Sequence, residues 1–147
     1  MPQTQHWLKT IYIALRIGMG IVFVWASWEK LLAPAEFAVI IDNYQLLPPF
    51  LINSVAVFLP WLELICGLAL IGGVYVRGSL LIINLMLIVF TIVLVANAFR
   101  GIDIDCGCFS VSANTKGRIM MDIVRDIGLM AVGMWLYYMR VKPLAQR

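Results

Sequence analysis

Residues 79–99, SLLIINLMLIVFTIVLVANAF, form the most uniformly apolar stretch of this chain. Asn84, Thr91 and Asn97 are its polar points, and no charged residue interrupts it. A helix rises about 1.5 Å per residue, so a stretch of this length crosses the roughly 30 Å hydrocarbon core of a bilayer. The stretch therefore predicts a transmembrane helix, and it sets the fold class of the whole protein.

Three further apolar segments of comparable length lie on either side of this one. The chain has 147 residues, of which 63% are hydrophobic and 13% charged, whereas soluble domains average about half apolar and a quarter charged. The mean hydropathy is +0.94. We predict an all-α integral membrane protein, a single domain over residues 1–147 that forms a four-transmembrane-helix bundle. The four predicted helices span about 11–32, 51–76, 79–99 and 119–139.

Short connections and prolines separate these segments. Arg77-Gly78 is so short a link that the segments on either side of it are expected to be antiparallel neighbours. Pro34, Pro48 and Pro49 favour a loop over residues 33–50. Pro60 lies inside the second segment, where it predicts a kink or a division of the helix.

The basic residues are distributed unequally between the two ends of such a bundle. Four spans put both termini on one side with the Arg77 link, and the connections on that side hold five basic residues and no acidic one. They are Lys9, Arg77, Arg140, Lys142 and Arg147. The positive-inside rule then places both termini in the cytoplasm. We predict a multi-pass protein of the bacterial inner (plasma) membrane, with the lipid bilayer as its partner. Its net charge of +3 is spread over the loops, which indicates no binding of nucleic acid.

Residues 105–110, DCGCFS, are the one place where reactive side chains lie close together outside an apolar segment. Thiols at i and i+2 of an extended turn, here Cys106 and Cys108, lie near the Cα separation that a disulfide accepts, and Gly107 supplies the freedom for so small a ring. Strained, exposed disulfides are easily reduced and more often catalytic or regulatory than structural. The predicted topology puts the pair on the extracytoplasmic, disulfide-permissive side. Cys106 and Cys108 are therefore the candidate catalytic residues.

A cysteine pair of this kind has two alternative roles, as part of a zinc site or as a structural clip. A zinc site needs about four ligands. Cys66, inside an apolar segment, and His6, on the opposite side, do not supply the missing two, so we expect no metal. A disulfide that only clips the loop stays open as an alternative. Cys66 itself is interpreted as a small buried hydrophobe.

Ionisable side chains inside the apolar segments are functional candidates, because each costs several kcal/mol unless it is paired or hydrated. Arg16 and Glu63 reach similar middle depths in the predicted bundle and form a candidate buried pair. A second group lies at the outer helix ends, beneath the cysteine loop, and supplies a supporting polar network. Its members are Glu29, Lys30, Asp122, Arg125 and Asp126. The alternative for all of these residues is architectural, since buried ion pairs can fix helix register and long basic side chains can extend to the interface.

Trp25 and Trp28 are the candidate contacts for a membrane quinone, as walls of a pocket. Their alternative role is in the aromatic belt that membrane proteins place at the bilayer interface. No tightly bound cofactor is expected beyond such a quinone.

Several short motifs, spread over nearly the whole chain, occur together in one group of membrane proteins. They are Arg16 followed by Gly20, Glu29-Lys30-Leu31, Tyr44-Gln45-Leu46-Leu47-Pro48, the stretch PWLELICG from Pro60 to Gly67, Asp105-Cys106-Gly107-Cys108-Phe109, and Arg125-Asp126. On these motifs the chain resembles the MauE/DoxX group of small four-helix membrane proteins associated with redox. The family pattern usually has Gly after the Phe, whereas Ser110 stands here, which alters the turn without removing the thiols.

The resemblance implies a four-helix bundle with a periplasmic cysteine pair that works in thiol oxidation or disulfide maturation. The implied partner is a thioredoxin-like or substrate protein, and DoxX-type members are linked to quinone-coupled sulfur oxidation. We therefore predict a membrane thiol–disulfide oxidoreductase, or its membrane component, in which Cys106 and Cys108 cycle between dithiol and disulfide. In this prediction Lys30, Arg125 and Asp126 tune the thiolates or handle protons. The alternative is a non-catalytic accessory subunit of a larger membrane complex.

Overall fold

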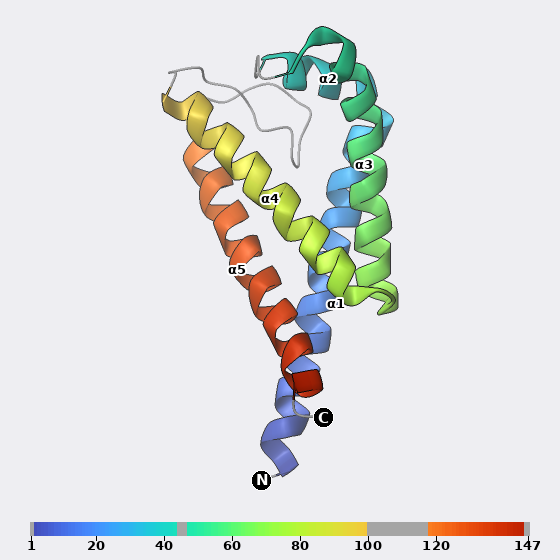
Figure 1. The fold of residues 1–147 in the computed structure, drawn as a ribbon, viewed down its shortest axis with the longest axis vertical. Helices are drawn as coiled ribbons and strands as arrows, with labels where there is room; N and C mark the ends of the chain where they lie inside the picture. Colours follow the sequence, from blue (N-terminus) through green and yellow to red (C-terminus); the bar gives the residue numbers. More distant parts are fainter. Residues whose placement is uncertain (1, 44–46, 100–117, 146–147) are drawn as a thin grey trace.

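The computed structural model describes residues 2–43, 47–99 and 118–145, which fold into helices and contain no strand (Figure 1). The helices are α1 (Pro2–Leu32), α2 (Pro34–Asn43), α3 (Pro49–Gly72), α4 (Val76–Phe99) and α5 (Arg118–Ala145). Three helices, over His6–Leu32, Pro49–Gly72 and Val76–Ala96, are long and apolar enough to cross a membrane. An all-α fold with membrane-crossing helices is thus confirmed over the described residues. A fourth crossing by α5 and the cytoplasmic location of the termini stay predictions.

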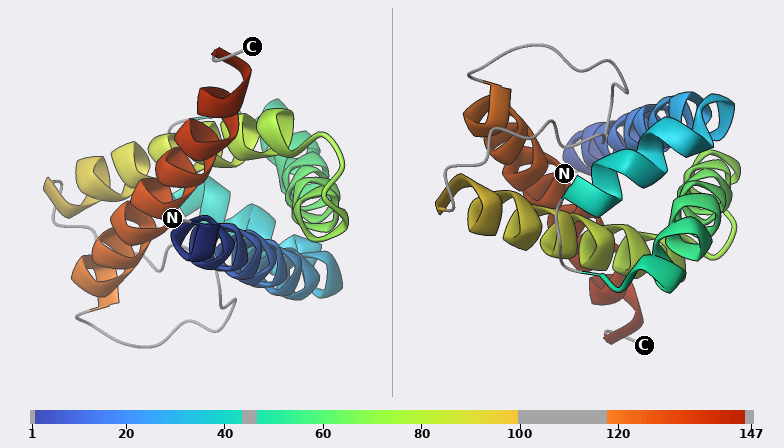
Figure 2. Two further views of the ribbon diagram at one scale, coloured as in Figure 1. Left: turned by 90° about the horizontal axis from the view of Figure 1, so that it is seen from below. Right: turned by 90° about the horizontal axis from the view of Figure 1, so that it is seen from above.

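The long helices are arranged as two pairs. α1 packs lengthwise on α3, and α4 packs on α5. Figure 1 shows the pairs meeting at the end of the molecule where α1 begins and α5 ends, and diverging toward the end where α2 lies. Seen from above in Figure 2, the end of α4 and the start of α5 lie on one side of the molecule and the end of α1 lies on the other. A shared apolar core joins the pairs. It includes Met19 and Phe23 of α1, Cys66 and Leu70 of α3, Leu80, Ile83 and Leu87 of α4, and Leu136 of α5.

α1 and α3 approach each other backbone to backbone at Gly20 and Gly67. A Cβ added to Gly20 would lie 2.8 Å from the Gly67 carbonyl oxygen, and one added to Gly67 would lie 3.0 Å from the Gly20 carbonyl oxygen. Small residues at a crossing let membrane helices pack this closely. The crossing sets the antiparallel register of α1 and α3, and that register decides which charged side chains can meet.

The turn between α3 and α4 begins at Gly73, which adopts the left-handed conformation with φ of 73°. The Gly73 N–H donates to the Leu70 carbonyl at 3.3 Å, and the Val74 N–H donates to the Ala69 carbonyl at 3.0 Å. These bonds satisfy the last carbonyls of the helix, as a glycine C-cap does. α3 therefore ends at Gly72 rather than near residue 76, and α4 begins at Val76 rather than near residue 79.

Gly73→Ala is expected to lower the free energy of unfolding by at least about 1 kcal/mol. The left-handed conformation costs an L-residue roughly 1–2 kcal/mol, and the new Cβ would lie 2.7 Å from Nη1 of Arg16. The measurement is SDS-induced unfolding in mixed micelles, followed by circular dichroism. Gly72→Ala is the matched control, because its Cβ would have its nearest neighbour at 3.9 Å. Equal stability of the two variants would contradict the prediction.

Two segments differ from the sequence prediction. Residues 34–43 form helix α2 instead of a loop, because proline suits the first helical position and Phe37 and Ile41 bury one face against Ile52 and Ala56 of α3. α1 begins at Pro2 rather than near Ile11, since nothing before Leu32 breaks the helix, and residues 6–11 of α1 are exposed. α3 runs through Pro60 as one helix.

Candidate functional site

Lys30 and Glu63 form an ion pair in the interior, between α1 and α3. The Lys30 Nζ atom lies 2.8 Å from Oε1 and 2.7 Å from Oε2 of Glu63. The two side chains expose only 1% and 2% of their surface. Moving an ion from water to such a site costs several kcal/mol, which good geometry within a pair can offset. Because the ammonium bonds both carboxylate oxygens, each charge is neutralised by the other.

Two aromatic rings complete the surroundings of the Lys30 ammonium. Nζ lies 5.3 Å from the ring centroid of Phe37 and 5.6 Å from that of Phe90, within the range of cation–π attraction. Lys30 comes from α1, Glu63 from α3, Phe37 from α2 and Phe90 from α4. Four elements therefore converge on one ammonium group, which makes the pair a junction between the two helix pairs.

Arg16 does not pair with Glu63, and the sequence prediction of that pair was wrong. A Cβ on Gly73 would lie 2.7 Å from Nη1 of Arg16, so Arg16 lies beside the end of α3. It precedes Lys30 by about 14 residues, or roughly 21 Å of helix. The prediction measured depth from a helix start near Ile11, whereas α1 begins at Pro2. Arg16 is consequently level with the end of α3, and Lys30 is the residue that reaches Glu63.

A second cluster of charges lies in the first turns of α5. Arg125 Nη1 is 2.9 Å from Oδ1 of Asp122, and Arg125 Nη2 is 3.2 Å from Oδ1 of Asp126. Asp122 and Arg125 are partly exposed, whereas Asp126 is fully buried. The Lys30 ammonium also acts on the Asp126 carboxylate electrostatically. Five residues of the predicted polar network thus lie in two groups, the Lys30–Glu63 pair and the α5 cluster (Asp122, Arg125 and Asp126). Their role in support of the cysteine pair stays a prediction.

Glu29 lies on the outer side of α1, apart from both of these groups. Its Oε1 atom accepts a hydrogen bond of 3.2 Å from Nε1 of Trp25. Trp25 and Trp28 are 66% and 60% exposed. The predicted contact of these tryptophans with a quinone stays a prediction.

Cys106 and Cys108 lie outside the described residues, in the segment that joins α4 to α5. α4 ends at Phe99 and α5 begins at Arg118. The start of α5 and the end of α1, which carries Lys30, lie toward the same end of the molecule (Figure 1). The α5 cluster therefore lies in the early turns of the helix that follows the cysteine segment, and the Lys30–Glu63 pair lies toward the same end of the molecule. Cys66, by contrast, is buried in α3, as its sequence context predicts.

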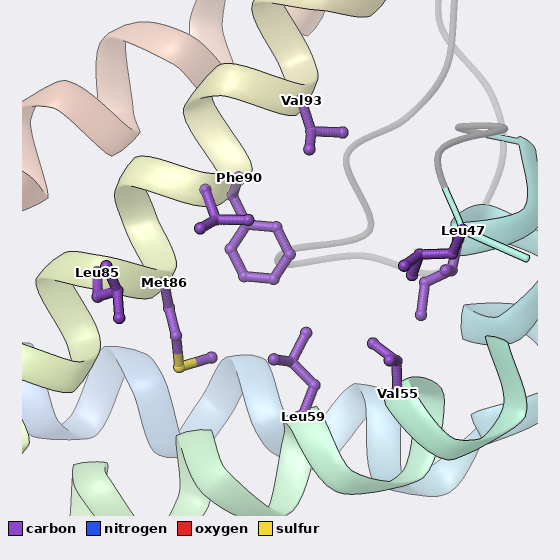
Figure 3. Close-up of a pocket in the computed structure, with 9 residues that line it drawn as sticks. Leu47, Val55, Leu59, Leu85, Met86, Phe90 and Val93 are labelled. Atoms are coloured by element: carbon purple, nitrogen blue, oxygen red, sulfur yellow. The ribbon is translucent and has the colours of Figure 1, made fainter. Parts of the chain in front are cut away.

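An apolar pocket of about 360 Å³ lies between α2, α3 and α4 (Figure 3). It is lined by Ile41, Leu47, Val55, Leu59, Leu85, Met86, Val89, Phe90 and Val93. These side chains suit hydrocarbon, and none of them offers a hydrogen bond to a polar head group. Phe90 belongs to both features, because its ring lines the pocket and faces the Lys30 ammonium. Phe90 thus connects the pocket lining to the surroundings of the ion pair.

The sequence profile of one family, described as methylamine utilisation protein MauE, matches residues 8–139. The chain belongs to the MauE family. The matched stretch contains Lys30, Glu63, the α5 cluster and the Cys106–Cys108 pair. The resemblance to MauE proteins that the motifs indicated is thereby confirmed.

Curated MauE proteins share about a third of their aligned residues with this chain. The methylamine utilization protein MauE of Methylophilus methylotrophus is 31% identical over 129 residues, which cover 87% of this chain and 67% of that protein. The MauE protein of Paracoccus denitrificans is 34% identical over 97 residues, covering 65% and 52%. That of Paracoccus versutus is 34% identical over 100 residues, covering 67% and 54%. The chain thus spans about half to two thirds of the length of these MauE relatives. No solved structure matches it significantly.

Sequence reasoning missed the two rings around Lys30. Phe37 lies in a segment that the prolines had assigned to a loop, although the apolar pair Phe37 and Ile41 at i and i+4 is typical of a helix face. Phe90 gave no signal, because it is one of many apolar residues in a stretch that contains no charged residue. Only the packing of α4 shows which of those apolar residues faces the charge.

Proposed function

We propose that this MauE-family chain is a membrane thiol–disulfide redox protein whose Cys106–Cys108 pair works on the extracytoplasmic face. The observation that carries the proposal is the buried Lys30–Glu63 pair with the α5 cluster beside it. Both groups lie toward the end of the molecule at which α4 ends and α5 begins. Charges of this kind are expensive in a bilayer and mark sites of proton or ion chemistry.

The proposed chemistry is disulfide exchange. A partner dithiol attacks the Cys106–Cys108 disulfide through a mixed disulfide, so the partner becomes oxidised and the Cys106–Cys108 pair becomes a dithiol. A membrane quinone then accepts two electrons and two protons from the dithiol and becomes a quinol, which restores the disulfide. Lys30, Arg125 and Asp126 supply the electrostatic field in which thiolates form and protons leave.

The physiological role that we propose follows the names of the relatives. They are methylamine utilization proteins, and we infer that this chain supports the same process by maturing disulfides of a periplasmic protein. A thioredoxin-like protein is the proposed intermediary. The location of the chain in the inner membrane, with the cysteine loop outside, belongs to the same proposal.

Cys106→Ser and Cys108→Ser are each expected to abolish thiol oxidation. The purified protein in lipid nanodiscs would be supplied with a reduced dithiol peptide and a short-chain ubiquinone, and the loss of free thiols would be followed. Cys66→Ala is the control. Because Cys66 is buried in the core, this substitution is expected to leave the rate of thiol oxidation unchanged. Thiol oxidation that continues in either serine variant would overturn the proposal. An oxidised Cys106–Cys108 pair with no thiol oxidation in the unmodified protein would favour the accessory-subunit alternative instead.

A further inference from the structure

Asp126 is a buried carboxylate that accepts a side-chain hydrogen bond through only one of its two oxygens. Its side chain is fully inaccessible, and Oδ1 accepts a hydrogen bond of 3.2 Å from Nη2 of Arg125. No described residue donates a hydrogen bond to Oδ2, which is also buried. A buried acceptor without a donor loses its hydrogen bonds to water with nothing in return, and the cost is larger when the group is charged. The Oδ2 atom of Asp126 is therefore a position at which the interior lacks a proton donor.

The surrounding charges do not balance. The two linked groups contain the cations Lys30 and Arg125 and the carboxylates of Glu63, Asp122 and Asp126. The Lys30 ammonium bonds both oxygens of Glu63, and Arg125 is shared between two aspartates. When all five groups are ionised, they carry three negative charges and two positive ones, so one negative charge has no matching cation among these described residues.

The described residues of the helices packed on α5 offer no further cation near Asp126, and on α5 itself Arg118 precedes Asp126 by about two turns. Arg77, at the opposite end, is the only charged residue of α4. On α1, Arg16 and Lys9 lie far below Lys30, and Glu29 faces outward to Trp25. A metal ion is not favoured, because no three ligating side chains come together within the described ranges. A proton is the cation that fits, since it needs one oxygen and no extra space.

We propose that Asp126, supported by the Lys30–Glu63 pair, is an internal proton-binding site that holds one exchangeable proton on Oδ2. A proton there neutralises the surplus charge and turns Oδ2 into a hydroxyl. The proton exchanges through the α5 cluster, whose Asp122 and Arg125 are partly exposed. This site rests on the described charges alone and does not depend on thiol chemistry.

Infrared spectroscopy of the full chain in lipid nanodiscs tests the proposal, because a protonated carboxyl has a C=O stretch that an ionised one lacks. At neutral pH the unmodified protein is expected to show such a band, which shifts in D₂O and fades as the pH rises. Asp126→Asn is expected to remove the band, whereas Asp122→Asn, at the exposed rim of the same cluster, is expected to retain it. Absence of the band in the unmodified protein, or an unchanged band in the Asp126→Asn variant, would overturn the proposal.

Isotope labelling of the unmodified protein keeps the test independent of variant folding. With ¹³C-aspartate the band is expected to move, and with ¹³C-glutamate it is expected to stay. A band that moves with glutamate would place the proton on a residue such as Glu63 and would overturn the assignment to Asp126. The same band is expected in the Cys106→Ser variant, so failure of thiol oxidation and failure of proton binding are distinguishable.

Discussion

Lys30→Met is expected to lower the free energy of unfolding by about 3–5 kcal/mol, the usual cost of removing one partner of a buried ion pair. The loss arises because the Glu63 carboxylate stays 2% exposed and has no cation left to neutralise it. Methionine fills nearly the same volume as the lysine stem, so packing against Phe37 and Phe90 changes little. SDS-induced unfolding in mixed micelles, followed by circular dichroism, measures the change.

The matched control is Lys9→Met, which makes the same replacement at an exposed position of the same helix. We expect it to change stability by no more than about 0.5 kcal/mol. The double variant Lys30→Met with Glu63→Leu is expected to recover most of the loss, since replacing a whole buried pair by apolar residues is often neutral or stabilising. Equal stability of the Lys30 and Lys9 variants would show that the pair is not buried in the folded protein.

The double variant also separates structure from function. If the pair only fixes the register of α1 and α3, the apolar double variant should fold and retain any activity of the unmodified protein. If the pair supplies the field for thiol or proton chemistry, the double variant should fold and lose that activity. The double variant is expected to fold in both cases, because the aromatic rings and the Gly20–Gly67 crossing still hold the helices in place when both charges are gone. Its activity therefore distinguishes the two roles of the pair.

The apolar segments predicted the all-α membrane class because hydropathy reports directly on the energy of burial in lipid. Helix ends were less predictable. The helix expected to end near residue 76 ends at Gly72, where left-handed Gly73 closes it, and two adjacent glycines do not reveal which of them turns the chain. The α2 helix depends on burial of Phe37 and Ile41 against α3, which is a tertiary contact.

The charged residues of the site were recognisable one by one, but their pairing was not. Lys30 and Glu63 were both identified, yet Glu63 was matched with Arg16. Pairing depends on the register of α1 against α3, and a shift of one helical turn moves a side chain by about 5.4 Å. The register is set where Gly20 and Gly67 meet. Apolar periodicity carries little information on register in a bilayer, where every lipid-facing position is apolar as well.

Gly20→Val tests that register directly and is expected to lower the free energy of unfolding by at least about 3 kcal/mol, the upper end of overpacking costs. Its Cβ alone would lie 2.7 Å from Cγ1 of Ile71 and 2.8 Å from the Gly67 carbonyl oxygen. A flexible side chain can move aside, but the backbone oxygen cannot unless α1 and α3 separate. Gly20→Ala is expected to have a smaller effect of the same sign.

The control for this prediction is Gly18→Val, two residues earlier on an exposed face of α1, where an added Cβ would meet nothing within 4 Å. Valine and alanine are better helix formers than glycine, so the Gly18 variants should be neutral or slightly stabilised. If the free energy of unfolding changes in opposite directions at Gly18 and Gly20, the loss at Gly20 comes from the contact between α1 and α3 and not from helix propensity. Since Lys30 reaches Glu63 only while the crossing is closed, Gly20→Val should also lose the stabilising effect of the ion pair. Lys30→Met should then cost much less in the Gly20→Val background than in the unmodified protein, and additive losses would show that the crossing does not set the register.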